Sequence, residues 1–244
     1  MRDVALTFGG LNPARDAVLN ALQELCKDTD LAARRLGLSL KQRGDIGANL
    51  KILDAPTLPA ISRYSGTLYD AILGGASGTD DPLRPEQLRL AKETVLIQSS
   101  LFGLISAGDL IPSYRLGAGT TLPNLRLSQV WPQAHEPIFG RLNQGLIVDL
   151  RSKAYVELAP IPRHIASHWV EVVSRASDGK LKALNHFNKQ AKGLLIRAVL
   201  RSDKQVRSID ELTEIAASIG MELRKDEVGN QLLLITDQVK KADL

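Results

Sequence analysis

The sequence predicts a single mixed α/β domain in which helices flank a central mixed sheet. Segments with the helical period of about 3.6 residues alternate along the chain with short apolar segments typical of strands. The 244 residues are 44% hydrophobic, which is enough for a sizeable core, and no internal repeat or low-complexity linker divides them. We therefore expect one compact domain that spans residues 1–244.

Helices are predicted for the N-terminal part of the chain. Asn12 and Pro13 suit the start of a helix, which apolar residues then continue. A helix at residues 31–36, a tight turn at 37–39 and a helix at 40–50 together resemble a helix-hairpin-helix element. Such an element presents backbone N–H groups and basic side chains to phosphates. Two short helices joined by a glycine also occur in helical proteins that bind no DNA, so both interpretations stay open.

The middle of the chain alternates between loop, helix and strand. Residues 54–59 contain two prolines and are expected to be a connector, while residues 74–85 and 117–123 are expected to be loops. Residues 63–73 have the pattern of an amphipathic helix, and a buried strand is predicted at residues 94–101.

The strongest strand patterns lie in the C-terminal half. The apolar run at residues 145–150, GLIVDL, is the clearest candidate for a buried strand. One hairpin is expected to turn at Asp178 and Gly179, and another at Gly229 and Asn230.

A helix predicted at residues 186–200 has one apolar side and one basic side. Gly193 lies near its centre, where glycine costs about 1 kcal/mol relative to alanine, so helix propensity alone predicts that Gly193→Ala stabilises the protein. Close approach of another backbone or of a ligand would explain the glycine. Alternatively, a surface helix simply tolerates it. The basic side suits a phosphate or carboxylate partner, and its cations are Lys189, Lys192 and Arg197.

The excess of positive charge is concentrated in two segments. The formal net charge is only +4, from 31 basic and 27 acidic residues. Residues 179–207 carry eight basic residues and one acid, and residues 34–51 carry five basic residues and one acid, so the rest of the chain is net negative. This segregation favours a basic cleft or face over an evenly solvated surface.

Several kinds of site are missing from the sequence. It contains no dinucleotide-binding or P-loop glycine motif and no serine-hydrolase elbow, and its four histidines lack metal-ligand spacing, so we expect no metal and no cofactor. The single cysteine, Cys26, permits no internal disulfide and indicates a reducing compartment. With no apolar run of about 18 residues and no signal peptide, the protein is expected to be cytoplasmic, with no membrane partner and no disulfide-linked partner.

Polar residues gather at the end of the strand predicted at 145–150, and strand ends are where α/β folds place ligands. The candidate catalytic residues are Asp149, Ser152, Tyr155, Lys189 and Lys192. Cations for a phosphate and flat rings for stacking suit a nucleobase-like ligand, although each residue also has an ordinary structural explanation. The predicted nucleic-acid or ligand contacts are Arg35, Lys41, Arg43, Arg63, Tyr64, Tyr114, Arg115, Arg151, Lys189, Lys192 and Arg197.

Five motifs in a fixed order resemble a known protein family. They are RYSGTLYDA from Arg63, SSLFGLI from Ser99, DLIPSYRL from Asp109, DLRSKAY from Asp149 and HFNKQAKGLLIR from His186. Together they resemble the YaaA family of peroxide-stress-response proteins, in its actinobacterial form, over nearly the whole chain. The resemblance implies a compact mixed α/β fold with a basic cleft and a helix-hairpin-helix, DNA binding, and protection against oxidative damage linked to iron.

The resemblance also assigns residues and marks one departure. It places the hairpin at residues 31–50, and members usually begin with a strand and a lysine-containing loop that this chain is expected to lack. Related domains in pathways that modify nucleobases keep an enzymatic role open. The cleft cations implied by the resemblance are Arg63, Arg115, Lys189, Lys192 and Arg197.

Two functions follow as alternatives. The first is a cytoplasmic stress protein that holds DNA, largely without sequence preference, by neutralising phosphates. The second is an enzyme for a nucleobase, nucleoside or related small molecule, with Asp149 as general base or amine-binding group and Lys189 or Lys192 as electrostatic stabiliser. An open basic groove favours the first alternative, and a closed pocket with Asp149 beside the lysines favours the second.

Overall fold

The computed structural model describes residues 5–74, 81–142, 145–176, 180–184, 187–226 and 230–236. The chain forms two compact units, each assembled from three separate stretches. Unit 1 comprises Met1–Arg63, Lys92–Leu142 and Ser152–Ile165, and unit 2 comprises Tyr64–Ala91, Asn143–Arg151 and Ala166–Leu244. The predicted mixed α/β class, with a mixed sheet flanked by helices, is confirmed. A single domain over residues 1–244 stays a prediction.

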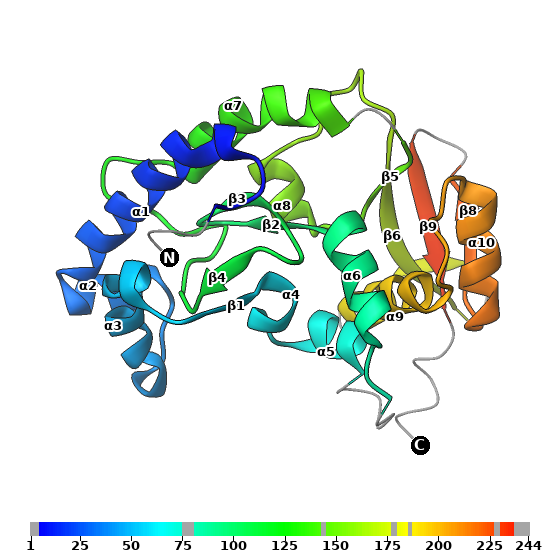
Figure 1. Ribbon diagram of the computed structural model, residues 1–244, viewed down its shortest axis with the longest axis horizontal. Helices are drawn as coiled ribbons and strands as arrows, with labels where there is room; N and C mark the ends of the chain where they lie inside the picture. Colours follow the sequence, from blue (N-terminus) through cyan, green and yellow to red (C-terminus); the bar gives the residue numbers. More distant parts are fainter. Residues whose placement is uncertain are drawn as a thin grey trace. The chain divides into compact units, whose positions relative to one another are not determined.

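Unit 1 begins with helices that pack around α1 (Figure 1). The predicted helix is present as α1, with a proline in its first turn and Val18, Leu22 and Leu25 on its buried side. Asn12 is its first residue and not its N-cap, which is Leu11, so that part of the prediction is wrong. The elements are η1 (Gly9–Leu11), α1 (Asn12–Cys26), α2 (Thr29–Arg35), η2 (Leu40–Gln42), α3 (Gly44–Leu50) and η3 (Ile52–Asp54).

The helix predicted at residues 40–50 is interrupted in the structure. Ser39 and Gln42 form a capping box that starts only a short 3-10 turn, and the α-helical part begins at Gly44. Gly37 has a φ of 64°, which suits a glycine turn after α2. The two helices and the turn are therefore present, whereas the helix-hairpin-helix itself stays a prediction.

The strands of unit 1 form two separate antiparallel pairs. β1 (Thr57–Pro59) pairs with β4 (Leu110–Pro112), and β2 (Leu96–Ser99) pairs with β3 (Gly103–Ser106). β2 confirms the strand predicted in this region, but the connector predicted at residues 54–59 contains β1, and β3 was not predicted at all. The helices of this part are α4 (Ala60–Arg63), α7 (Leu127–Phe139), η4 (Gly140–Leu142) and α8 (Lys153–Leu158).

The sheet of unit 2 has five strands. In order across the sheet, β5 (Ile147–Asp149), β6 (Ser167–Arg175) and β9 (Gln231–Ile235) are parallel, and β8 (Glu222–Lys225) is antiparallel to β9. β7 (Leu181–Ala183) pairs antiparallel with the end of β6. Both predicted hairpin pairings are confirmed, although Asp178, Gly179 and Gly229 lie outside the described residues.

The prediction for residues 145–150 was only partly right. β5 has three residues and is an edge strand that is only partly buried. Its apolar residues Val148 and Leu150 pack against the core from this edge. An apolar run of this kind is therefore explained by contact with the core and does not require a central strand.

Two helices, α9 (Asn188–Arg201) and α10 (Ile209–Ser218), pack against one face of this sheet (Figure 1). Ser208 caps α10, because its side chain accepts a hydrogen bond from the Glu211 N–H at 3.2 Å. Two more helices are α5 (Thr67–Leu73) and α6 (Pro85–Thr94), whose last turn belongs to unit 1. The core between sheet and helices contains Val170, Val172, Ala191, Leu195, Leu212, Ala216, Met221, Leu223, Leu232 and Leu234.

Gly193 is required because α5 packs directly against α9. A Cβ atom at Gly193 would lie 2.7 Å from the Ala71 Cβ and closer still to the carbonyl oxygen of Leu68. The glycine is therefore explained by a neighbouring backbone, which is one of the two explanations offered above. The prediction that Gly193→Ala stabilises the protein is wrong, because it considered only the propensity of an isolated helix.

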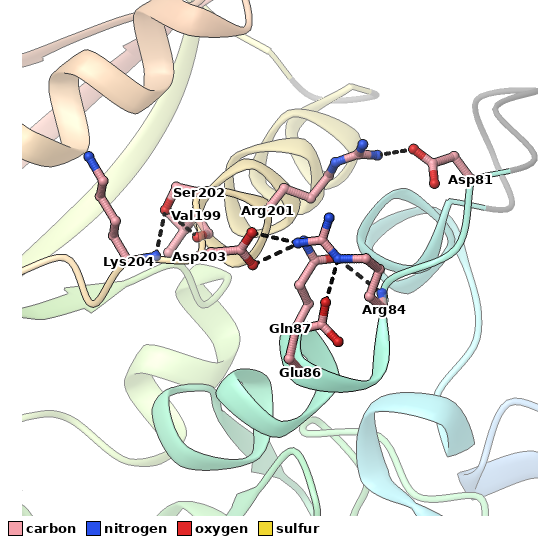
Figure 2. Close-up of polar contacts among 9 residues, drawn as sticks. All are labelled: Asp81, Arg84, Glu86, Gln87, Val199, Arg201, Ser202, Asp203 and Lys204. Carbon is pink, nitrogen blue, oxygen red and sulfur yellow. Dashed lines mark hydrogen bonds and ion pairs between the residues drawn. The ribbon is translucent and has the colours of Figure 1, made fainter.

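A set of exposed ion pairs fastens the start of α6 to the end of α9 (Figure 2). Asp203 accepts hydrogen bonds from Arg84 at 2.5 Å and from Gln87 at 3.2 Å. Arg201 pairs with Asp81 at 2.5 Å. Because these groups are exposed, water and salt screen them, and we assign them a positioning role with little effect on stability.

Candidate functional site

The cations of residues 34–51 form the basic part of unit 1. Arg34, Arg35, Lys41 and Lys51 are exposed. Arg43 is also exposed and pairs with Asp30 at 3.1 Å. Apart from this pair, the described residues place no acidic side chain within ion-pair distance of these cations. Most of the positive charge of this segment is thus available to an external anion.

The exposed Arg115 is attached to the same region through its backbone. Asn49, which is buried in α3, accepts a hydrogen bond from the Arg115 N–H at 2.8 Å and donates one to the Arg115 carbonyl at 2.9 Å. Arg35 donates to the carbonyl of Thr121 at 3.1 Å, further along the same loop. Arg115 therefore joins the cations of residues 34–51, and we call these six residues the basic surface of unit 1: Arg34, Arg35, Lys41, Arg43, Lys51 and Arg115.

Two other predicted contact residues of unit 1, Arg63 and Tyr114, form hydrogen bonds or ring contacts with residues of the same unit. Arg63 donates hydrogen bonds to the carbonyls of Ile111 and Pro56, both at 3.2 Å. The Tyr114 hydroxyl lies 2.7 Å from the Ser99 Oγ, and its ring packs edge-on against Phe102. These contacts support the strands and the loop beside them.

The predicted group of Asp149, Ser152 and Tyr155 is divided between the two units. Ser152 is exposed and precedes α8, while the Tyr155 hydroxyl accepts a hydrogen bond from the Ser100 Oγ at 3.2 Å; both belong to unit 1. Asp149 belongs to unit 2. A shared site of these three residues stays a prediction.

Asp149 and Arg151 form a buried ion pair at the end of β5. The Arg151 Nε donates to the Asp149 Oδ1 at 2.8 Å, and its Nη2 donates to Oδ2 at 2.7 Å. The backbone N–H of Arg151 also donates to Oδ1 at 3.1 Å. The side chains are only 15% and 7% exposed for Arg151 and Asp149 respectively. Two parallel hydrogen bonds of this kind fix both groups in place.

Lys192 of α9 reaches this same strand end. Its Nζ lies 3.4 Å from the carbonyl oxygen of Arg151 and 5.5 Å from the centre of the Trp169 ring. Trp169 donates from its Nε1 to the same carbonyl at 2.9 Å. The parallel register places Asp149 directly beside Trp169, with Glu171 next on the same face of the sheet. The predicted basic helix and the Asp149 strand end therefore do meet.

Burial controls the charge of Lys192. The residue is 3% exposed, and the loss of hydration lowers the pKa of its amine to about 8, although Asp149 and Glu171 act in the opposite direction. Asp149 is already held by Arg151, and the Glu171 carboxylate accepts a hydrogen bond from Gln231 at 2.6 Å. We call Asp149, Arg151, Trp169, Glu171 and Lys192 the Lys192 cluster.

The remaining predicted contact residues of unit 2 differ in their exposure and in the groups they contact. Lys189 is exposed, whereas Arg197 is buried and donates to the carbonyls of Ile72 and Asp81. Burial lowers the pKa of Arg197. Tyr64 stacks on Tyr69, with ring centres 5.2 Å apart.

Trp169 and Glu171 were not predicted as site residues. Trp169 and Glu171 are two residues apart in β6, so their side chains lie on the same face of the sheet. Only the pairing register shows that Asp149 of β5 lies on this face too. The sequence does not contain that register, because the turn between β5 and β6 is long and holds α8.

Neither a metal site nor an exposed thiol is found among the described residues. Among the described residues, no group of three or more His, Cys, Asp or Glu side chains could hold a metal ion. Cys26 is fully buried beside Asn49, and burial raises the pKa of its thiol. No helix in the described part of the chain is long and apolar enough to cross a membrane.

Comparison with known proteins agrees with the motifs. The family model described as peroxide stress protein YaaA matches residues 9–226. The chain belongs to this family. It is 35% identical to a UPF0246 protein of Corynebacterium efficiens over 95% of this chain and 90% of the relative. A UPF0246 protein of Corynebacterium glutamicum is 37% identical, covering 88% and 84% of the two chains, and one of Streptomyces coelicolor is 34% identical, covering 91% and 84%.

Proposed function

We propose that this YaaA-family member is a cytoplasmic peroxide-stress protein that binds duplex DNA through the basic surface of unit 1, largely without sequence preference. The observation that carries the proposal is the exposure of this surface. Its cations come from residues 34–51 and from the loop at Arg115, and Arg43 alone among them has an acidic partner within the described residues.

Exposure decides which cations can bind a polyanion. A surface cation exchanges water and counterions for phosphate and gains affinity from counterion release. A buried cation that already donates to protein carbonyls, as Arg197 does, has few N–H donors accessible to a phosphate. All five cations of residues 34–51 are exposed, whereas Lys192 and Arg197 of the second segment are buried. The proposal therefore places the DNA on the first segment and the Arg115 loop.

The same surface favours binding that does not depend on sequence. Its cations lie on short helices and turns, and no long helix presents them to the major groove. Leu40, beside Lys41, is 82% exposed and offers an apolar contact to a groove wall.

A salt titration with matched triple variants tests the proposal. Arg34→Gln, Lys41→Gln and Lys51→Gln together remove three exposed charges from the basic surface of unit 1. Lys182→Gln, Lys204→Gln and Lys225→Gln together remove three exposed charges from unit 2. Binding to a duplex of random sequence is measured by fluorescence anisotropy at several salt concentrations.

The two triple variants should give different salt slopes. If the three residues each neutralise one phosphate, the slope of log affinity against log salt falls by about 2 to 3 in the first variant. The second variant should keep the slope of the wild type. Equal slopes for the wild type and the first variant, or no binding of the wild type at low salt, would contradict the proposal.

A further inference from the structure

The Lys192 cluster of unit 2 has chemistry that DNA binding does not use. We propose that Lys192 is the reactive amine of a small-molecule site, and that it condenses reversibly with an uncharged aldehyde or ketone. The proposal is independent of the DNA-binding surface, which lies on other residues in unit 1.

The first argument is the hydrogen bonding of the Lys192 amine. An ammonium group has three N–H donors. Within the described residues, the only hydrogen bond of Lys192 Nζ is a long one of 3.4 Å to the Arg151 carbonyl. The residue is only 3% exposed, which leaves little room for water molecules around this nitrogen. A ligand that bonds to this nitrogen would resolve the deficit.

The second argument is the distribution of charge. Asp149 could have held Lys192 as an ammonium ion, but both oxygens of this carboxylate are bonded to Arg151. The Arg151 guanidinium therefore occupies the carboxylate that could otherwise pair with Lys192, and desolvation is one way in which a reactive lysine is activated. Loss of hydration lowers the pKa of Lys192 to about 8, and the charges of Asp149 and Glu171 oppose this only in part.

The proposed reaction balances without an oxidant or reductant. The lone pair of the uncharged Lys192 nitrogen attacks the carbonyl carbon, a C–N bond forms, and the carbonyl oxygen takes a proton to give a carbinolamine. The C–O bond then breaks with uptake of a second proton, water leaves, and a protonated imine remains. One of these protons comes from the amine itself and the other from solvent. Glu171 and Asp149 stabilise the positive charge of the imine.

The charges of the cluster also select the class of ligand. With the Lys192 amine uncharged, the cluster carries one positive charge, on Arg151, and two negative charges, on Asp149 and Glu171. An anionic carbonyl compound such as a 2-oxo acid is therefore disfavoured. The Trp169 ring beside Nζ suits an apolar substituent on the carbonyl carbon.

Reductive trapping on the wild-type protein tests the proposal. The protein is exposed briefly to propanal and cyanoborohydride at about pH 7.5, and alkylated lysines are located by mass spectrometry. At this pH about a quarter of Lys192 is uncharged, against about one in a thousand for a lysine with an ordinary pKa. A less basic amine is a weaker nucleophile, so we expect Lys192 to react at least about tenfold faster than the exposed Lys189 of the same helix.

Two internal controls make each outcome decisive. Alkylation of the buried Cys26 by iodoacetamide, measured in parallel, reports unfolding, and Lys192 should react well before Cys26. Pyruvate in place of propanal should reduce the preference for Lys192 over Lys189. The proposal is overturned if Lys192 reacts no faster than Lys189 or only together with Cys26, and the choice of an uncharged ligand is overturned if pyruvate labels Lys192 equally well.

Discussion

The two basic segments of this chain look similar in sequence, but only the second segment buries some of its cations. In residues 34–51 the five basic side chains are exposed. In α9, Lys192 and Arg197 are 3% and 7% exposed and contact protein groups. Local charge density therefore does not identify a binding surface, because a basic helix can place its cations in the interior when carboxylates and carbonyls receive them.

The largest effect is expected from the buried ion pair of unit 2. Asp149→Ala leaves the Arg151 guanidinium buried without its carboxylate, and breaking a buried pair in this way costs about 3–5 kcal/mol. In unit 1, Arg43→Gln breaks an exposed pair and should change stability by no more than about 0.5 kcal/mol. Urea unfolding of both variants measures the difference, and comparable losses would contradict the contrast between the buried and the exposed ion pair.

Lys192 should make stability depend on alkaline pH. Its pKa is about 8 in the folded protein and 10.5 in an unfolded chain, so between these values the unfolded chain holds a proton that the folded protein has released. The free energy of unfolding therefore rises with pH across this interval, by about 3 kcal/mol in total. Below pH 8 both states are protonated, and the full burial cost of the ammonium is present.

Lys192→Met removes this titration and isolates its contribution. The variant should be more stable than the wild type near pH 7, and the difference should shrink as pH rises from 8 to 10.5. Other lysines titrate in both proteins and cancel in the comparison. If the free energies of unfolding of the two proteins change in parallel with pH over this range, Lys192 keeps an ordinary pKa.

Two glycines in helices should respond to alanine with opposite signs. Gly193→Ala places a methyl group against the backbone of α5 and should cost about 1–3 kcal/mol. Gly47→Ala in α3 meets no atom within 4 Å and should be neutral or stabilise by up to about 1 kcal/mol. Thermal melting of both variants tests this, and a stabilising Gly193→Ala would disprove the close contact.

The smallest expected effect is that of hydrogen peroxide or an alkylating reagent on the Cys26 thiol. Because the thiol is buried and its pKa is raised, we expect little reaction with hydrogen peroxide or an alkylating reagent in the folded protein. Mass spectrometry before and after peroxide exposure checks this. Rapid oxidation of folded Cys26 would point to a thiol chemistry that its burial argues against.

Periodicity predicted most of the elements that local sequence controls. The helix that begins near Pro13 and both hairpin pairings of unit 2 follow from short patterns. β1 and β3 were missed because each is a short strand that forms by pairing, β1 with β4 and β3 with β2. Pairing of this kind depends on tertiary contacts that no local pattern contains.

The candidate site was predicted in part for the same reason. Asp149, Arg151 and Lys192 were recognised from residue type and position, and the structure brings them together. Trp169 and Glu171 required the register of β5 against β6. The burial of Lys192 and Arg197 could not be predicted, because a count of charges along a helix does not show which carbonyls and carboxylates face it.

Lysine footprinting with and without DNA tests the division between the two segments most directly. The full chain is acetylated in the presence and absence of a random duplex, and the modified lysines are located by mass spectrometry. We predict that DNA protects Lys41 and Lys51 and leaves Lys182, Lys189 and Lys204 unchanged, although all five are exposed in the free protein. Protection of the second group without the first would contradict the assignment of DNA binding to unit 1.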